Sequence, residues 1–175
     1  DLWNDGRWRA NQWGQLLFVI EGSVLIVAGT VISIVGMTSV FVHEDLEFMR
    51  TTVSELTNAH PQLIPLIAHD RATFGGMLIS CGAVTFFAAL WGFQRGQAWL
   101  WWGLMSAGTL AFCATILVHW RVGYNSLMHL LPAYIGLEWL WMAGLFSYPF
   151  LVKRDPRLES EWQRRLRKPG LSTPI

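Results

Sequence analysis

Residues 16–42 read LLFVIEGSVLIVAGTVISIVGMTSVFV, an apolar run that contains one charged side chain, Glu21. The hydrocarbon core of a bilayer is about 30 Å thick, and roughly 20 apolar residues in an α-helix cross it. The run is therefore long enough to span a membrane, and its excess length requires the helix to tilt or to project beyond the hydrocarbon. This stretch predicts an integral membrane protein.

Three further segments, 72–93, 99–118 and 127–152, are also long and apolar enough to cross a bilayer. The composition agrees, because 53% of the 175 residues are hydrophobic and only 14% are charged, which is too apolar for an ordinary soluble domain. The short stretch QRGQA at 94–98 predicts a tight antiparallel hairpin between the second and third spans. We therefore predict an all-α polytopic membrane protein, a four-transmembrane-helix bundle with interfacial helices.

The segments outside the spans carry most of the charge. Residues 1–15 alternate Trp with Arg, Asn and Gln, which is typical of an interfacial segment. In the outer loop, 43–71, apolar residues recur at helical spacing between positions 46 and 56, and this predicts a surface helix. Pro61 and Pro65 are expected to end helical structure there. Residues 153–175 form a basic tail.

The distribution of Lys and Arg predicts the orientation. Basic residues in short flanking segments are retained on the cytoplasmic side of a membrane. Ten Lys and Arg lie in segment 1–15, loop 94–98 and tail 153–175, whereas three lie in loop 43–71 and the loop after the third span. Both termini and the tail are therefore predicted to be cytoplasmic.

All five histidines lie on the predicted outer side: His43, His60, His69, His119 and His129. Residues that share a helical face with the four histidines at the span ends are mostly small, and small residues mark the surfaces where membrane helices touch. From His69, for example, this face runs through Thr73, Gly76 and Ser80. We expect His43, His69, His119 and His129 to point into the bundle at a similar depth.

Several roles are open for this predicted histidine cluster. Imidazoles from facing helices ligate metals or haem iron, and Asp45 and Asp70 are near enough in sequence to fix the histidine tautomers. No single helix carries the HxxxH or ExxH spacing of a di-metal site. The histidines could instead cap helix ends, or they could exchange protons with a bound quinone.

The sequence HDR at 69–71 also has a structural interpretation. Asp70 is predicted to lie in the first turn of the second span, where the helix dipole favours a carboxylate. Arg71 is expected to reach the headgroup layer or to pair with an outer acid such as Glu44 or Asp45.

Two acidic residues lie inside predicted spans. Glu21 is close enough to the cytoplasmic end of the first span for water or Arg9 to reach it. Glu138 lies near mid-bilayer in the fourth span, where a charge costs several kcal/mol and usually marks function. Nine residues, or about 180° of helical rotation, separate it from His129, so Glu138 is predicted to face away from the bundle. There it would be protonated towards lipid or would contact a group on another molecule, and we favour the partner.

The stretches HEDLEFM at 43–49, LIPLIAHDRATFGG at 63–76 and VHWRVGYNSLMHLLPAYIG at 118–136 resemble a group of uncharacterised small four-span bacterial integral membrane proteins. HDRxxFGG is the most specific element, and the resemblance covers roughly residues 16–150. It implies the same number of spans and a bacterial inner membrane location. It implies no activity.

Two functions remain open from the sequence. The first is an accessory or structural subunit of a larger energy-transducing membrane complex, of respiratory or photosynthetic type, that contacts lipid and other membrane subunits through its transmembrane surface. The second is a membrane oxidoreductase or electron-transfer protein with a metal, haem or quinone in the outer histidine cluster. No P-loop, Rossmann fingerprint or nucleophile elbow occurs, and nothing indicates nucleic-acid binding.

Overall fold

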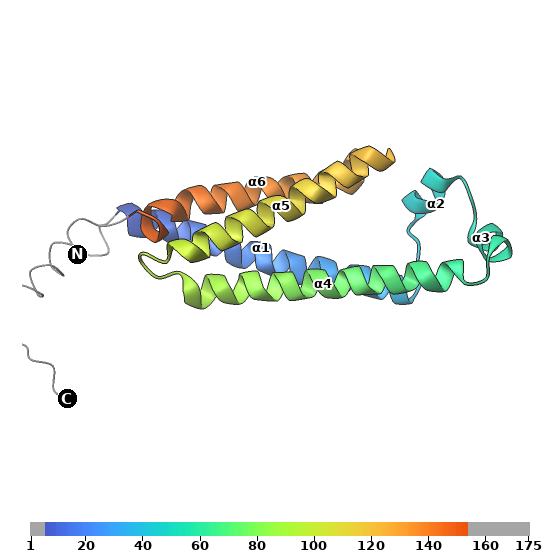
Figure 1. Cartoon of the computed structure of the whole chain (residues 1–175), viewed down its shortest axis with the longest axis horizontal. Coiled ribbons are helices and arrows are strands. Elements are labelled where there is room, and N and C mark those ends of the chain that lie inside the picture. Colours follow the sequence, from blue (N-terminus) through green and yellow to red (C-terminus); the bar gives the residue numbers. More distant parts are fainter. Residues whose placement is uncertain (1–5, 154–175) are drawn as a thin grey trace, which may run out of the picture.

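The computed structural model describes residues 6–153, and this part of the chain is helical without strands, which confirms the predicted fold class (Figure 1). The helices are α1 (Gly6–Met37), α2 (His43–Met49), α3 (Val53–Ala59), α4 (Leu63–Gly92), α5 (Ala98–Val122) and α6 (Leu127–Leu151). Four of them, α1, α4, α5 and α6, are long and apolar enough to cross a membrane. We call the end where α1 begins and α6 ends the terminal end, and the end with α2 and α3 the distal end.

The first long helix differs from the predicted span at both of its ends. It begins at Gly6, so most of the predicted interfacial segment is continuous with the span. It ends at Met37, and Val40 shortly after it adopts a left-handed backbone conformation, with φ of 63°, which does not continue a helix. His43 consequently begins the separate helix α2 instead of ending the first span.

The helix α4 begins at Leu63, well before the predicted span start at residue 72. Pro65 lies in its first turn, where backbone N–H groups have no intrahelical acceptor and proline therefore removes no hydrogen bond. The predicted break in helical structure does occur, since α3 ends at Ala59 and α4 begins at Leu63, but Pro65 lies inside α4 and does not end it. Asp70 thus lies beyond the first turn of α4, contrary to the prediction from the sequence. The basic tail beyond residue 153 lies outside the described residues.

A seam of small residues joins α1 to α4. Gly22, Gly29 and Gly36 on α1 are buried, as are Gly75 and Gly82 on α4. A Cβ atom added to Gly29 would lie 2.5 Å from the carbonyl oxygen of Gly75 and 2.8 Å from the backbone nitrogen of Ile79. The two backbones therefore approach too closely for any other side chain, as in other membrane helix pairs with small residues at their contact.

Hydrogen bonds across the same seam fix its register. The Gln15 Nε2 donates to the carbonyl oxygen of Ala89 at 2.8 Å, and the Ser33 hydroxyl donates to that of Ala72 at 3.3 Å. The contact face of α4 is thus the face of Gly75 and Gly82, whereas a Cβ at Gly76 would meet nothing within 4 Å. The predicted contact face through Gly76 is wrong by one residue, or about 100° of rotation.

The helices α5 and α6 form a second pair, which joins the first through α1. Phe18 of α1 is fully buried in a core with Ala89, Met105, Leu140 and Ala143. Close packing is possible because Gly14 of α1 faces Ala143 and Ser147 of α6. The predicted hairpin of α4 and α5 has its short loop, but α5 packs mainly on α6 and hardly contacts α4.

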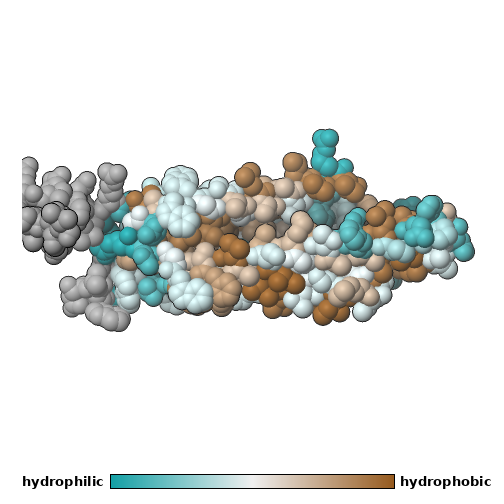
Figure 2. Space-filling model, turned by 60° about the horizontal axis from the view of Figure 1, so that its bottom comes forward, coloured by the Kyte–Doolittle hydropathy of each residue, from teal (hydrophilic) through white to brown (hydrophobic). Residues whose placement is uncertain are grey.

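The outer surface of the four long helices is mostly apolar. Figure 2 shows pale and brown residues along the middle of the molecule and hydrophilic residues gathered towards its two ends. In the 18-residue apolar stretch of α5 only 6% of the residues are buried. Most of this helix therefore faces lipid or another protein, which agrees with an integral membrane protein.

Candidate functional site

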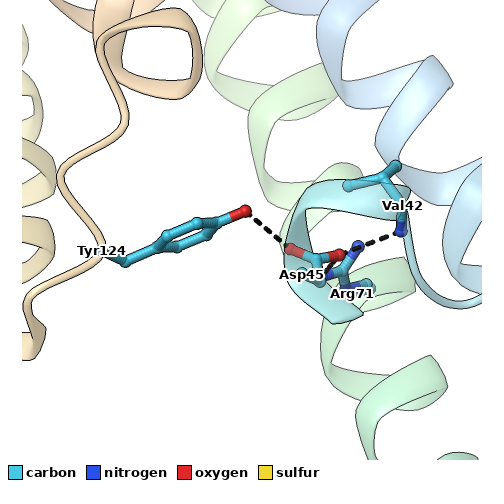
Figure 3. A network of polar contacts seen from close by, with 4 residues as sticks. All are labelled: Val42, Asp45, Arg71 and Tyr124. Carbon is cyan, nitrogen blue, oxygen red and sulfur yellow. Dashed lines mark hydrogen bonds and ion pairs between the residues drawn. The ribbon is translucent and has the colours of Figure 1, made fainter. Parts of the chain in front are cut away.

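A polar cluster at the distal end joins three elements that are far apart in the sequence (Figure 3). The Arg71 guanidinium of α4 donates to Oδ2 of Asp45 in α2 at 2.5 Å, and the Tyr124 hydroxyl donates to Oδ1 of Asp45 at 3.1 Å. The backbone N–H of Val42 also donates to Oδ2 of Asp45, at 3.0 Å. Asp45 is therefore the common acceptor of the cluster, and the predicted pairing of Arg71 with an outer acid is confirmed.

Local structure places these side chains. Asp45 occupies the first turn of α2, where its carboxylate caps an otherwise unpaired N–H group. Gly123 ends α5 in a left-handed conformation, with φ of 83°, and its N–H bonds back to His119. The chain therefore turns sharply before Tyr124, whose ring lies 4.7 Å from the ring of Phe48 on α2.

The electrostatics of the cluster keep Tyr124 neutral. The pKa of its hydroxyl is raised to about 12, first by burial and then by the negative charge of Asp45 and the hydrogen bond to it. The side chain of Asp45 is 9% exposed and that of Arg71 is 28% exposed. This ion pair is therefore shielded from water to a degree that surface pairs are not.

Two of the four predicted histidines meet beside this cluster. The rings of His119 in α5 and His129 in α6 lie 5.1 Å apart, and the ring of Tyr124 lies 4.5 Å from that of His129. Nδ1 of His119 lies 2.7 Å from the carbonyl oxygen of Thr115, so this nitrogen carries the proton and donates. Nε2 of His119 is then the acceptor when the ring is neutral.

The other two predicted histidines lie elsewhere. His43 is exposed at the start of α2, because α1 ends before it. His69 is 74% exposed and contacts its neighbour Asp70 at 3.2 Å. The contact face of α4 runs through Gly75 and Gly82. His69 lies six residues before Gly75, on a side of the helix that points away from α1. The expected convergence of all four histidines is therefore wrong.

The positions of the four histidines can be compared with the predicted metal or haem site. Within residues 6–153, no three His, Cys, Asp or Glu side chains come together as a metal site would require. His119 and His129 also lie against each other, and a haem ligated by both rings would need to fit between them. Within residues 6–153, the four predicted histidines therefore do not come together as one metal or haem site. Of the predicted tautomer-fixing carboxylates, Asp45 accepts hydrogen bonds from Arg71 and Tyr124, and Asp70 contacts His69 on the exposed surface.

The two membrane carboxyl groups differ in environment. Glu138 is exposed on the outer surface of α6, close to the middle of its 25 residues, as predicted. Within the described residues it has no hydrogen bond or ion pair. Glu21 is only 5% exposed, and its Oε2 has no hydrogen-bond partner within residues 6–153. Glu21 lies on the packed side of α1 and is more buried than its position near the end of the predicted span suggested.

The chain has no match among protein-family models, among curated proteins or among solved structures. Sequence reasoning also missed Tyr124 as a site residue. Gly123 follows the third predicted span, and a glycine in this position commonly ends a helix with a sharp turn. This pattern predicts that Tyr124 lies in a turn beside two spans that carry histidines.

Proposed function

We propose that this chain is an integral membrane subunit that assembles with other membrane proteins through the outer face of α6, in a complex of the energy-transducing type. One observation carries the proposal: Glu138 lies on the lipid-facing surface near the middle of a spanning helix. A carboxyl group exposed to hydrocarbon is costly, and polar groups at this depth usually face protein.

The surroundings of Glu138 support a protein contact. Exposed apolar side chains follow the same side of α6 towards both ends, including Leu131, Ile135 and Leu145. With Glu138, these residues recur at intervals of four, three and seven, which is the pattern of a helix that packs along one stripe. A partner helix with a hydrogen-bond donor at this depth would satisfy the carboxyl group and cover the stripe.

The test is the accessibility of Glu138 to dicyclohexylcarbodiimide, a lipid-soluble reagent that modifies protonated carboxyl groups. In native membranes we expect Glu138 to be protected, and after dispersal in a strong detergent we expect it to be labelled. Glu21 is an internal control, because its burial within the chain protects it in both states. Mass spectrometry locates the label. Equal labelling of Glu138 in both states would contradict the proposal.

Substitution gives an independent measurement of the same contact. Glu138→Gln should weaken binding of the partner by about 0.6 to 2 kcal/mol, or roughly 3- to 30-fold in affinity. The reason is that the hydrogen bond between the carboxyl group and the partner is weakened or lost. Val84→Ala on the exposed side of α4 is the control and should leave assembly unchanged. A chain that purifies as a lone monomer from mild detergent would refute the proposal.

A second candidate function is quinone binding at the distal end. The observation that favours it is the packing of His119, Tyr124 and His129 into one aromatic group next to Asp45. A quinone ring stacks on such a surface, and imidazole nitrogen atoms exchange protons with its oxygen atoms. When bound, the quinone would supply the redox chemistry, while His129 and His119 would hold or accept its protons.

Extraction of quinone from the purified chain tests this second candidate. The wild-type chain should retain quinone after detergent exchange, and His129→Leu should lose most of it because a ring nitrogen is removed at nearly constant volume. His69→Leu is the matched control, since His69 is exposed and contacts Asp70 instead of the aromatic group. Equal retention by both variants would exclude the site.

A further inference from the structure

The start of α4 and the turn before it form an open apolar groove at the distal end. The groove has a volume of about 490 Å³ and is lined by His60, Gln62, Leu63, Pro65 and Leu66. Three of these five side chains are apolar, and Leu66 is 59% exposed. His60 directly follows α3, which packs on the start of α4. The groove therefore lies where these two helices meet.

The groove lies outside the hydrocarbon of the bilayer. His69 and Asp70 follow it along α4, and their side chains are 74% and 72% exposed. Exposed polar side chains of this kind belong in the headgroup layer or in water. Because α4 runs from the distal end towards the terminal end, the residues before His69 lie farther from the bilayer centre than His69 does (Figure 1). The apolar lining of the groove therefore faces the aqueous phase.

The length of α4 supports this position. Its 30 residues make a helix about 45 Å long, whereas about 20 residues are enough to cross the hydrocarbon. Trp91, near the other end of α4, is 68% exposed, and exposed indole rings at the ends of spanning helices mark the headgroup layer. Arg71 lies about 20 residues before Trp91. The turns of α4 that precede Arg71 thus project beyond the membrane.

The segment that carries the groove is acidic. Residues 43–70, which we call the distal segment, contain five acidic residues and one basic residue, Arg50. Arg71 follows directly, and its charge is paired with that of Asp45. The other four acidic side chains are exposed: Glu44, Glu47, Glu55 and Asp70. The distal segment therefore has a negative surface next to its apolar groove.

Local hydrogen bonds keep Glu55 in its anionic form. The backbone N–H of Thr52 donates to Oε2 of Glu55 at 2.8 Å, and the Thr51 hydroxyl donates to the same oxygen at 3.1 Å. The bonds from Thr52, followed by that from Thr51, hold the pKa of Glu55 below its ordinary value. Glu55 belongs to α3, the helix that packs on the start of α4, so this charge is part of the surface beside the groove.

We propose that the groove and the acidic distal segment dock a soluble protein that presents a large apolar side chain within a basic surface. The apolar side chain fills the groove against Leu63, Pro65 and Leu66, and the surrounding Lys and Arg of the partner face the exposed carboxylates. A lipid surface is the poorer occupant, because the groove projects away from the bilayer and anionic headgroups would be repelled. This docking surface is independent of the contact proposed for Glu138, in the middle of α6.

The test is the binding of two synthetic peptides to the full chain in phosphatidylcholine nanodiscs, measured by fluorescence anisotropy. One peptide carries a leucine flanked by lysines, and the other carries the same leucine flanked by glutamates. We expect the lysine peptide to bind, the glutamate peptide not to bind, and added salt to weaken the binding. Empty nanodiscs give the background of peptide on lipid.

Substitutions separate the apolar contact from the charge. Leu66→Ser should weaken binding about tenfold, since burial of a leucine side chain contributes at least that much. Leu127→Ser is the matched control, because Leu127 is 68% exposed at the distal start of α6 and does not line the groove. Glu55→Gln removes a charge but keeps an acceptor for the Thr52 N–H, and it should weaken binding about two- to fivefold. Arg50→Gln should strengthen binding by a similar factor.

Three outcomes would overturn this proposal. Equal binding of the two peptides would show that the acidic distal segment does not select a basic partner. Equal effects of Leu66→Ser and Leu127→Ser would show that the groove holds no apolar side chain. Failure of both peptides to bind the wild-type chain would exclude the docking surface as a whole. Circular dichroism of each variant verifies that its helices are intact, and none of these outcomes changes the expected labelling of Glu138.

Discussion

Replacement of Gly75 by alanine is expected to destabilise the protein by about 3 kcal/mol, at the upper end of the cost of overpacking a core. An added Cβ would lie 2.5 Å from the carbonyl oxygen of Gly29 and 2.7 Å from the backbone nitrogen of Ser33. These are backbone atoms of a packed helix, so relief requires α1 and α4 to move apart along their seam. For a chain of this size the loss corresponds to a fall in Tm of roughly 6 to 12 °C.

The neighbouring glycine supplies the control for this experiment. A Cβ at Gly76 meets nothing within 4 Å, so Gly76→Ala should be neutral or stabilise the helix by up to about 1 kcal/mol through helix propensity. Thermal unfolding followed by size-exclusion chromatography in detergent measures both variants. Adding Ser33→Ala to Gly75→Ala should not restore stability, because the Gly29 carbonyl oxygen remains. Similar Tm values for Gly75→Ala and Gly76→Ala would contradict the seam.

Asp45→Asn is expected to cost about 2 kcal/mol. Asp45 accepts hydrogen bonds from Arg71, Tyr124 and the Val42 N–H, and loss of its charge leaves the guanidinium without its counter-ion. Breaking a fully buried pair costs roughly 3 to 5 kcal/mol. The smaller value applies here because the Arg71 side chain is 28% exposed and water reaches part of it.

A control variant and a second measurement distinguish loss of the Asp45 contacts from the loss of any negative charge. Asp70→Asn removes the same charge from a side chain that is 72% exposed, and it should change stability by less than about 0.5 kcal/mol. In Asp45→Asn the pKa of Tyr124 should also fall from about 12 towards its ordinary value of 10.0. The fall is partial because burial, the largest cause of the raised pKa, persists. Unchanged phenolate absorbance during alkaline titration would contradict the Tyr124 contact.

The raised pKa of Tyr124 also fixes the sign of a pH effect. In the folded chain the hydroxyl keeps its proton to higher pH than in the unfolded chain. Its contribution to stability is therefore complete below about pH 10 and is lost as pH rises through about 12. Tyr124→Phe should remove this part of the alkaline dependence.

Hydropathy was sufficient to predict four spanning helices, because the minimum length of a span depends on bilayer thickness, but α1 and α4 differ from their predicted bounds. The outward position of Glu138 was predicted from its phase within one helix. The seam was only partly predicted. Its phase on α4 was inferred from His69, and this phase included Gly76, which lies about 100° away from the contact.

The distal end could not be predicted in the same way. The left-handed turn at Val40 occurs at a β-branched residue, which local rules disfavour, and it separates His43 from α1. The bond between Tyr124 and Asp45 joins residues 79 positions apart. Such a contact depends on how the two helix pairs pack, and periodicity within a helix carries no information about it.

The glycine seam also has a consequence during synthesis of the chain. A ribosome completes α1 before α2, α3 and α4, so the groove of Gly22, Gly29 and Gly36 enters the bilayer before the helix that fills it exists. At about 5 to 20 residues per second, the wait for α4 lasts several seconds. During that interval lipid or an insertion factor must occupy the groove. Of the described helices α6 emerges last, and it packs on α1 near Gly14.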